Sequence, residues 1–238
     1  DSHKKIISLL KQLTSEFGVD LHLYPMSPGK DAKNIKTLMK ISDWLIFNLI
    51  QRDTLFVAIG GGVVGDLVGF LASTYYRGVA LIHIPTNVIA MSDSSIGGKT
   101  AINTNKHVNT LGTYKHPIMT LMYSEYLSTL TKREFYAGFA EIIKISILKQ
   151  GPLKVKILEN KSAQDLLQKK DDFLEILNLA IQYKIEFTNK DIRERSKRLF
   201  LNFGHTFGHA IESIQDLSTE EYYRHGEAVS LGMVSALY

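Results

Sequence analysis

Three histidines and one glutamate in this sequence are suited to hold a metal ion. His205 and His209 are four residues apart in a segment with helical character, so both rings would project from one helix face. His225 follows, and Glu141 stands three residues before Lys144 in an earlier helix-like segment. Two histidines and a carboxylate that leave one position open are a common catalytic zinc set. By themselves, two histidines on a helix are more often ordinary polar residues.

The composition limits the ligands and partners. The chain has 238 residues, of which 45% are hydrophobic and 22% charged, so it can bury the core of one large domain or two smaller ones. It has no cysteine, and any metal must be bound by histidine and carboxylate. A net charge of +4 suits a small anionic substrate but not nucleic acid. The sequence shows neither a signal peptide nor an apolar run of membrane-spanning length, and we expect a cytoplasmic protein without a membrane partner.

The N-terminal half must supply a scaffold for such a site. Its hydrophobic periodicity predicts helices at residues 3–17, 34–51 and 66–74, and strands at residues 19–23, 55–59 and 79–84. The last two strands are continuous apolar runs, which are typical of parallel strands covered on both faces. This order predicts an α/β unit whose ligand lies beyond the carboxyl ends of the strands.

A glycine run occupies the predicted ligand-binding edge of this sheet. Gly60, Gly61 and Gly62 directly follow one strand, and Thr86 ends the next. A glycine run at a strand-to-helix turn lets backbone N–H groups approach a phosphate. Such a turn is about as often a tight turn without a ligand.

A second glycine-rich stretch, residues 93–100, is predicted to be a loop. Lys99 stands between Gly98 and Thr100, as at the end of a P-loop, but Asp93 takes the place of that motif's first glycine. The spacing therefore does not favour nucleotide hydrolysis. A lysine on such a loop still suits a substrate phosphate, and the alternative is a solvated surface lysine.

The C-terminal half is predicted to be helical. Residues 102–126 look irregular, and Thr131 with Glu134 then forms a capping box that opens a helix through Leu148. That helix carries Glu141. From about residue 153 the pattern remains mainly helical. We therefore predict two domains, an α/β domain at residues 1–127 and an all-α domain at residues 128–238.

Eight segments together resemble the 3-dehydroquinate synthases, within the wider sugar-phosphate cyclase family. They follow the family order between about residues 53 and 233, which makes the combination far more specific than any one of them. The segments are GGGVVGD at 60–66, YRG at 76–78, IPT at 84–86, DSSIGGKT at 93–100, REF at 133–135, AEIIK at 140–144, LNFGHTFGHAIE at 201–212 and HGEA at 225–228.

The resemblance implies an N-terminal NAD-binding, Rossmann-like α/β domain and an all-α metal-binding domain that is incomplete at its C-terminus. It implies zinc or cobalt bound by Glu141, His205 and His225. It implies an NAD site formed by Gly60, Gly61, Gly62, Asp66, Thr86, Lys99 and Asn109. It implies substrate contacts from Asp93, Lys99, Asn109, Lys144, Lys184, Arg198, Asn202 and His209. Arg77 matches an arginine that reaches the neighbouring subunit's site, which implies a homodimer.

The implied activity is that of a carbon–oxygen lyase in the shikimate pathway of aromatic amino-acid biosynthesis. It would convert 3-deoxy-arabino-heptulosonate 7-phosphate to 3-dehydroquinate and phosphate, through transient NAD oxidation, phosphate elimination, re-reduction and ring closure. Arg198, Asn202 and His209 favour this reaction, since only this substrate carries a carboxylate that needs Arg198. The alternatives are a 2-epi-5-epi-valiolone or 2-deoxy-scyllo-inosose type of cyclase, a polyol or glycerol-phosphate dehydrogenase, and an inactive truncated homologue.

Overall fold

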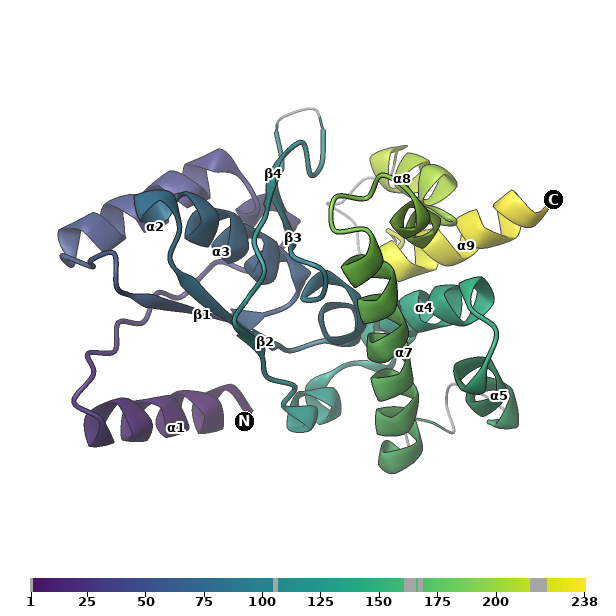
Figure 1. The fold of residues 1–238 in the computed structure, drawn as a ribbon, viewed down its shortest axis with the longest axis horizontal. Helices are drawn as coiled ribbons and strands as arrows, with labels where there is room; N and C mark the ends of the chain where they lie inside the picture. Colours follow the sequence, from purple (N-terminus) through teal and green to yellow (C-terminus); the bar gives the residue numbers. More distant parts are fainter. Residues whose placement is uncertain (1, 105–106, 161–165, 167–168, 215–221) are drawn as a thin grey trace.

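A small parallel sheet lies in the N-terminal half (Figure 1). In the computed structural model, which describes residues 2–104, 107–160, 166, 169–214 and 222–238, its strand order is β1–β2–β5. The strands are β1 (Leu55–Gly60), β2 (Ala80–Pro85) and β5 (Met119–Thr120). β1 and β2 pair in parallel from Leu55 opposite Ala80 to Gly60 opposite Pro85, which confirms the parallel pairing predicted for the two apolar runs.

Two helices cover one face of this sheet. α3 (Gly62–Thr74) connects β1 to β2, and α2 (Ile35–Phe47) packs with it around a core that includes Leu38, Phe56 and Leu67. The Asn34 side chain caps α2 by accepting the Thr37 N–H at 2.9 Å. An antiparallel pair, β3 (Lys99–Ile102) and β4 (Leu111–Tyr114), lies next to α3. α1 (Ser2–Glu16) runs along the bottom of Figure 1, where it contacts the turn at Ser124–Thr129 and buries Ile6.

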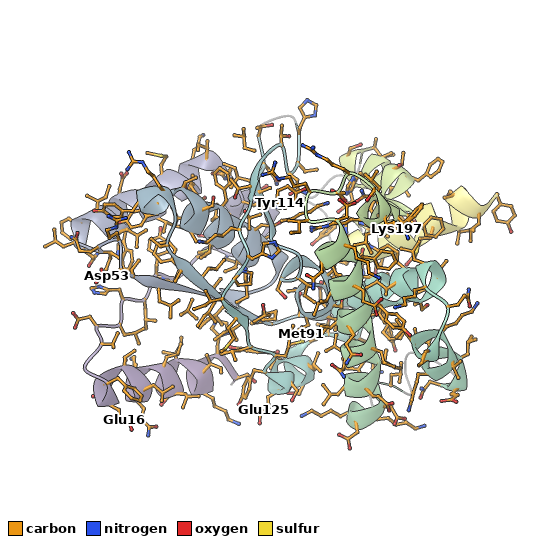
Figure 2. All side chains as sticks on the ribbon, viewed as in Figure 1. Glu16, Asp53, Met91, Tyr114, Glu125 and Lys197 are labelled. Atoms are coloured by element: carbon orange, nitrogen blue, oxygen red, sulfur yellow. The ribbon has the colours of Figure 1, made fainter. Side chains whose placement is uncertain are left out.

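The C-terminal half is a set of helices around a second apolar core (Figure 1). The helices are α4 (Lys132–Leu148), α5 (Pro152–Glu159), α7 (Lys170–Lys190), α8 (His205–Ile214) and α9 (His225–Leu237). Phe135, Ile142 and Phe173 lie in this core, and Met91, labelled in Figure 2, joins it from the N-terminal half. The predicted boundary at residue 128 stays a prediction.

Short helical turns connect these elements. They are the 3₁₀ helices Lys30–Ala32, Tyr75–Arg77, Ser124–Thr129 and Lys197–Asn202 and the π-helix Ala90–Ser94. Among the described residues, no helix has both the length and the apolarity needed to cross a membrane.

Several predicted elements differ from the structure. The strand predicted at residues 19–23 is wrong: this segment is an irregular connection, and Val19 is 57% exposed, since alternation alone provides no neighbouring strand. The region at residues 102–126 is not wholly irregular, because it contains β4, β5 and a 3₁₀ turn. The predicted loop at residues 93–100 begins within the π-helix and ends in β3, where Lys99 pairs with Tyr114. α3 begins at Gly62, four residues earlier than predicted.

Candidate metal and substrate site

Glu141, His205 and His225 are brought together by three helices. Glu141 lies within α4, and the two histidines are the first residues of α8 and α9. Glu141 Oε1 is 3.7 Å from His205 Nε2 and 3.6 Å from His225 Nε2. These separations are too long for hydrogen bonds. They are close to the roughly 3.3 Å between ligand atoms on a tetrahedral metal with bonds of about 2.0 Å.

The Glu141 carboxylate is fully buried, and its two oxygens have different surroundings. Oε2 accepts a hydrogen bond from the Lys144 ammonium. Oε1 accepts no hydrogen bond from any residue that the structure describes. Burial opposes the charge of Glu141, but Lys144 and the two histidines outweigh it and hold the pKa of Glu141 well below its usual range. An orphaned, ionised oxygen that faces two ring nitrogens fits a bound divalent cation.

Both histidines point the same nitrogen toward Glu141. His205 Nδ1 is 3.3 Å from the Phe203 carbonyl oxygen, and His225 Nδ1 is 3.0 Å from Glu212 Oε2. Because carbonyl and carboxylate oxygens only accept, Nδ1 carries the proton in each ring. The Nε2 lone pair of each neutral ring then faces Glu141, as metal ligation requires.

The two rings differ in their protonation. Burial and the nearby Lys144 ammonium lower the pKa of His205 to about 4, so this ring is neutral at pH 7. Burial also opposes the charge of His225, but the nearby carboxylates of Glu141 and Glu212 outweigh it and raise its pKa to about 9. A metal at this point must therefore displace a proton from His225.

Glycines beside the histidines let the three helices approach closely. A Cβ on Gly226 would lie 1.7 Å from the carbonyl oxygen of Ala137 on α4. Gly204, which has a φ of 80°, would place a Cβ 2.5 Å from Met233 Cγ on α9. Arg133 of α4 also holds the start of α9, because its Nε and Nη2 donate to the two Glu227 carboxylate oxygens at 2.7 and 2.8 Å. The glycine–histidine and histidine–glycine pairs of the sequence therefore reflect helix packing.

Further predicted substrate residues lie around Glu141. Lys184 of α7 donates to both the carboxylate and the carbonyl oxygen of Asp93. Burial opposes the charge of Lys144, but Glu141 and Asp93 outweigh it and raise its pKa. Asp93, Lys144 and Lys184 thus form one charged cluster with Glu141, in which the charges of neighbouring members shift the pKa of Asp93 and of Lys184.

Glu194 links two other predicted residues, and the sequence analysis missed it. Lys99 Nζ forms an ion pair with Glu194, and Asn202 Nδ2 donates to its Oε1 at 2.9 Å. Buried Arg198 donates at 2.8 Å to the carbonyl oxygens of Gly97 and Ile192. The acidic Glu194 within an otherwise basic segment was the one available signal.

Four of the predicted NAD residues, Gly60, Gly61, Gly62 and Thr86, lie at the carboxyl ends of β1 and β2. The Thr86 N–H donates to the Gly60 carbonyl at 3.0 Å, and Thr86 lines a cavity of about 320 Å³. A Cβ on Gly61 would lie 2.6 Å from Asn87 Nδ2, and one on Gly62 would lie 3.1 Å from Ser94 Oγ. The glycine run therefore has a packing role here.

Lys33 joins two of the predicted NAD residues. The sequence analysis did not identify Lys33 as part of the site. Its ammonium forms an ion pair with Asp66 at 2.5 Å and donates to Asn109 Oδ1. Lys33 and Asn109 are 76 residues apart in sequence. Burial raises the pKa of Asp66 despite the pairing with Lys33.

His209 and Arg77 stand outside the group of Glu141, His205 and His225. The exposed His209 ring lies 5.3 Å from the His205 ring and 6.1 Å from the His225 ring, centre to centre. Arg77 precedes β2, whereas Thr86 follows it. Arg77 is thus at the opposite end of that strand from the predicted cofactor residues.

Comparison with known proteins identifies the family. The sequence models described as 3-dehydroquinate synthase N-terminal and C-terminal match residues 23–137 and 138–238. The chain belongs to the 3-dehydroquinate synthase family. A 3-dehydroquinate synthase of Prochlorococcus marinus (strain MIT 9211) is 40% identical over 223 residues, which are 93% of this chain and 59% of that protein. The chain spans about three-fifths of the length of the curated relatives it matches.

Solved structures of sugar-phosphate cyclases have the same fold. The 2-epi-5-epi-valiolone synthase of Streptomyces hygroscopicus subsp. jinggangensis 5008, with NAD+ and Zn2+ bound, is 31% identical with a TM-score of 0.83, over 94% of this chain and 62% of that one. A 2-deoxy-scyllo-inosose synthase complexed with carbaglucose-6-phosphate, NAD+ and Co2+ is 30% identical with a TM-score of 0.79, over 95% and 62%. A probable glycerol dehydrogenase from Sinorhizobium meliloti 1021 is only 15% identical with a TM-score of 0.55, over 95% and 66%, and shows the fold alone.

Proposed function

We propose that this chain carries the NAD- and metal-dependent centre of a 3-dehydroquinate synthase. The reaction converts 3-deoxy-arabino-heptulosonate 7-phosphate to 3-dehydroquinate and phosphate. The single observation that carries the proposal is the orphaned, buried Glu141 Oε1 facing His205 Nε2 and His225 Nε2 beside Lys144. Membership of the family supplies the choice of reaction.

Glu141, His205 and His225 would hold the metal, for which an N₂O donor set without cysteine suits zinc or cobalt. The first turn of α3 would receive the NAD diphosphate, since its N-cap Gly61 has no side chain to satisfy the N–H groups. When bound, NAD would supply a reversible hydride acceptor, and the metal would supply a Lewis acid for the alcohol that is oxidised. The NAD-binding, Rossmann-like character of the N-terminal half is part of this proposal.

The cationic side chains around Glu141 would bind the anionic groups of the substrate. Lys99 and Asn202 are held together by Glu194, so a phosphate between them would compete with that carboxylate. Arg198 keeps further N–H donors for a substrate carboxylate beyond the two that bind backbone carbonyls. Asp93, paired with buried Lys184, would orient hydroxyl groups. Exposed His209 would move protons to and from solvent.

We infer a homodimer in which Arg77 reaches the neighbouring subunit's site. Arg77 is exposed and lies at the opposite end of β2 from Thr86, so it is badly placed to serve the site of its own chain. Tyr76 and Arg77 both adopt left-handed backbone, with φ of 48° and 66°, which is costly and common at functional turns.

Another sugar-phosphate cyclase is the second candidate. It is favoured by the 31% identity and TM-score of 0.83 to the valiolone synthase structure. Substrates with and without a carboxylate separate the two, because only the first kind needs Arg198. A dehydrogenase would instead accumulate NADH.

Phosphate release from 3-deoxy-arabino-heptulosonate 7-phosphate tests the proposal. With NAD+ and zinc, we expect release that a chelator abolishes and that builds up no NADH. Release from sedoheptulose 7-phosphate alone would favour the second candidate. Failure to release phosphate from either, by a folded chain that binds zinc, would overturn the proposed activity of this chain while leaving the metal centre in place.

A further inference from the structure

A carboxylate lies behind the histidine that begins α9. Glu212 belongs to α8, and its Oε2 is 3.0 Å from His225 Nδ1. Both side chains are largely buried, at 16% and 28% exposed. The two residues are 13 apart in sequence, so the contact depends on the packing of α8 against α9. Neither the metal ligation nor the substrate contacts assigned above use Glu212.

We propose that Glu212 is a positioning residue, which fixes the tautomer and ring orientation of His225 so that Nε2 faces the metal centre. Its carboxylate can only accept, so the Nδ1–H of His225 must donate to it. The opposite nitrogen, Nε2, is then left without a proton in the neutral ring and lies 3.6 Å from Glu141 Oε1. A carboxylate behind a ligating imidazole also raises the basicity of the ligand. The inference rests on the metal centre proposed above.

His225 needs such a partner more than His205 does. His205 Nδ1 contacts the carbonyl oxygen of Phe203, only two residues earlier in the chain, at 3.3 Å. His225 is the first residue of α9, whose backbone is fixed by Arg133 and Glu227. Those contacts place the backbone of α9 but leave the torsions of the His225 ring free. Within the part of the chain that the structure describes, the side chain that hydrogen-bonds to His225 Nδ1 is that of Glu212.

The same atoms invite a competing interpretation. One ligand atom each from His209, Glu212 and His225 lie within 4.8 Å of one another, which suits a second metal ion. That ion would need His225 to bind metals through both nitrogens, and the ring would then have to lose both protons. A distance of 3.0 Å between Nδ1 and Oε2 is instead that of a hydrogen bond to a carboxylate. Metal stoichiometry distinguishes the two interpretations.

Zinc affinity is the first test. Binding would be measured by competition with a chromophoric chelator for the unmodified chain, Glu212→Ala, Glu212→Gln and the control Glu186→Ala. The control removes a glutamate from an exposed ion pair with Lys149. We expect Glu212→Ala to weaken zinc binding about 10- to 100-fold, as loss of such outer partners does. Glu212→Gln keeps an acceptor oxygen and should recover part of that loss, and the control should bind as the unmodified chain does.

Cobalt(II) provides the second readout, because its visible absorption reports ligand geometry. We expect one Co2+ per chain and a changed spectrum in Glu212→Ala, with Glu212→Gln closer to the unmodified chain. Far-UV circular dichroism identifies any variant that fails to fold, and the near-isosteric Gln variant then carries the test. Two ions per chain, reduced to one in Glu212→Ala, would overturn the positioning role. Unchanged affinity and spectrum in both variants would also overturn it, while no zinc binding by the unmodified chain would remove the metal centre itself.

Discussion

The residues predicted to bind metal and those predicted to bind NAD differ in what they contact. We call the surroundings of Glu141, His205 and His225 the metal side, and the surroundings of the Gly60–Gly62 run and Asp66 the cofactor side. Around Glu141, side-chain atoms from three helices that could ligate a metal lie close together. Glu141 Oε1 accepts no hydrogen bond from the described residues. On the cofactor side, Asp66 of α3 and Asn109 of the connection between β3 and β4 both contact the Lys33 ammonium. A metal is recognised by side-chain atoms, whereas a diphosphate at a helix N-terminus is recognised by backbone N–H groups. A metal site can therefore be predicted from the types of its residues. A diphosphate site is marked in the sequence only by glycines, which leave the backbone N–H groups uncovered.

The absence of a side chain at glycine serves a different structural purpose on the metal side and on the cofactor side. On the metal side it lets two backbones meet, as where a Cβ on Gly232 would lie 2.0 Å from the Gly204 carbonyl oxygen. On the cofactor side, the atoms that a Cβ would meet belong to side chains, Asn87 at Gly61 and Ser94 at Gly62. Side chains can move aside at small cost and backbones cannot. The metal side should accordingly be the less tolerant of substitution.

The largest effect is expected from Glu141→Gln. The substitution removes the charge of the predicted ligand and leaves Lys144, which is 1% exposed, without its carboxylate partner. Breaking a buried pair in this way costs about 3–5 kcal/mol of stability. We expect urea unfolding to show that loss and equilibrium dialysis to show no retained zinc.

A double variant separates the two consequences of that change. Glu141→Gln combined with Lys144→Met removes both charges, and replacement of a whole buried pair is often neutral. We expect it to restore most of the stability but none of the zinc binding. Recovery of zinc binding would contradict the assignment of Glu141 as a ligand.

Acid should weaken the cofactor side through His83. This residue of β2 is 5% exposed beneath Gly65 of α3, and burial lowers its pKa to about 4. Below pH 6.5 the unfolded chain binds a proton there that the folded chain does not, so stability falls as pH decreases toward 4. The contribution is about 2 kcal/mol by pH 5 and about 3 kcal/mol in full. Urea unfolding of His83→Gln at pH 7 and pH 5, with a chelator present, should show a smaller loss than the unmodified chain; an equal loss would exclude His83 as the cause.

The sequence predicted the parts of both sides that depend on local pattern. The apolar runs became β1 and β2 with their parallel pairing, and Thr131 caps α4 by accepting the Glu134 N–H at 3.2 Å. The Glu134 carboxylate, however, pairs with Arg224 at 2.7 Å, so it contacts the start of α9. Helix caps and strand runs are readable because their partners are a few residues away.

Contacts between distant segments could not be read in the same way. Lys33 and Glu194 each join two predicted site residues and Glu212 contacts His225, yet none of the three stands at a spacing that marks it. Their partners are set by how α8, α9 and the β3–β4 pair pack, which periodicity does not specify. The strand expected at residues 19–23 failed for the same reason, since a strand exists only where a partner edge is available. Metal, substrate and NAD assignments for individual residues stay predictions.

A matched pair of glycine substitutions compares the two sides directly. Gly226→Ala forces a Cβ against the Ala137 carbonyl on the metal side, whereas the Cβ of Gly62→Ala meets the side chain of Ser94 on the cofactor side. Overpacking of the first kind costs about 1–3 kcal/mol, and we also expect weaker zinc binding because α9 must shift His225. Gly62 is the first residue of α3, where alanine's helix propensity offsets a small displacement, so the change should stay below about 1 kcal/mol. If urea unfolding showed the same loss of stability in both variants, the expected difference between backbone and side-chain contacts would be contradicted.

The smallest effect is expected at two left-handed residues, and only one of them should matter for activity. Arg77 and Leu49 have φ of 66° and 56°, a conformation that costs a side chain about 1–2 kcal/mol and glycine little. After glycine's greater loss of backbone entropy, Arg77→Gly and Leu49→Gly should each stabilise the chain by about 0.5–1 kcal/mol. Leu49 is 77% exposed after α2 and serves as the matched control. If the strain at Arg77 is retained because its guanidinium reaches a neighbouring subunit, Arg77→Gly should lower phosphate release while Leu49→Gly leaves it unchanged. Equal activity of the two variants would mean that this turn is conformational strain without a role in the site.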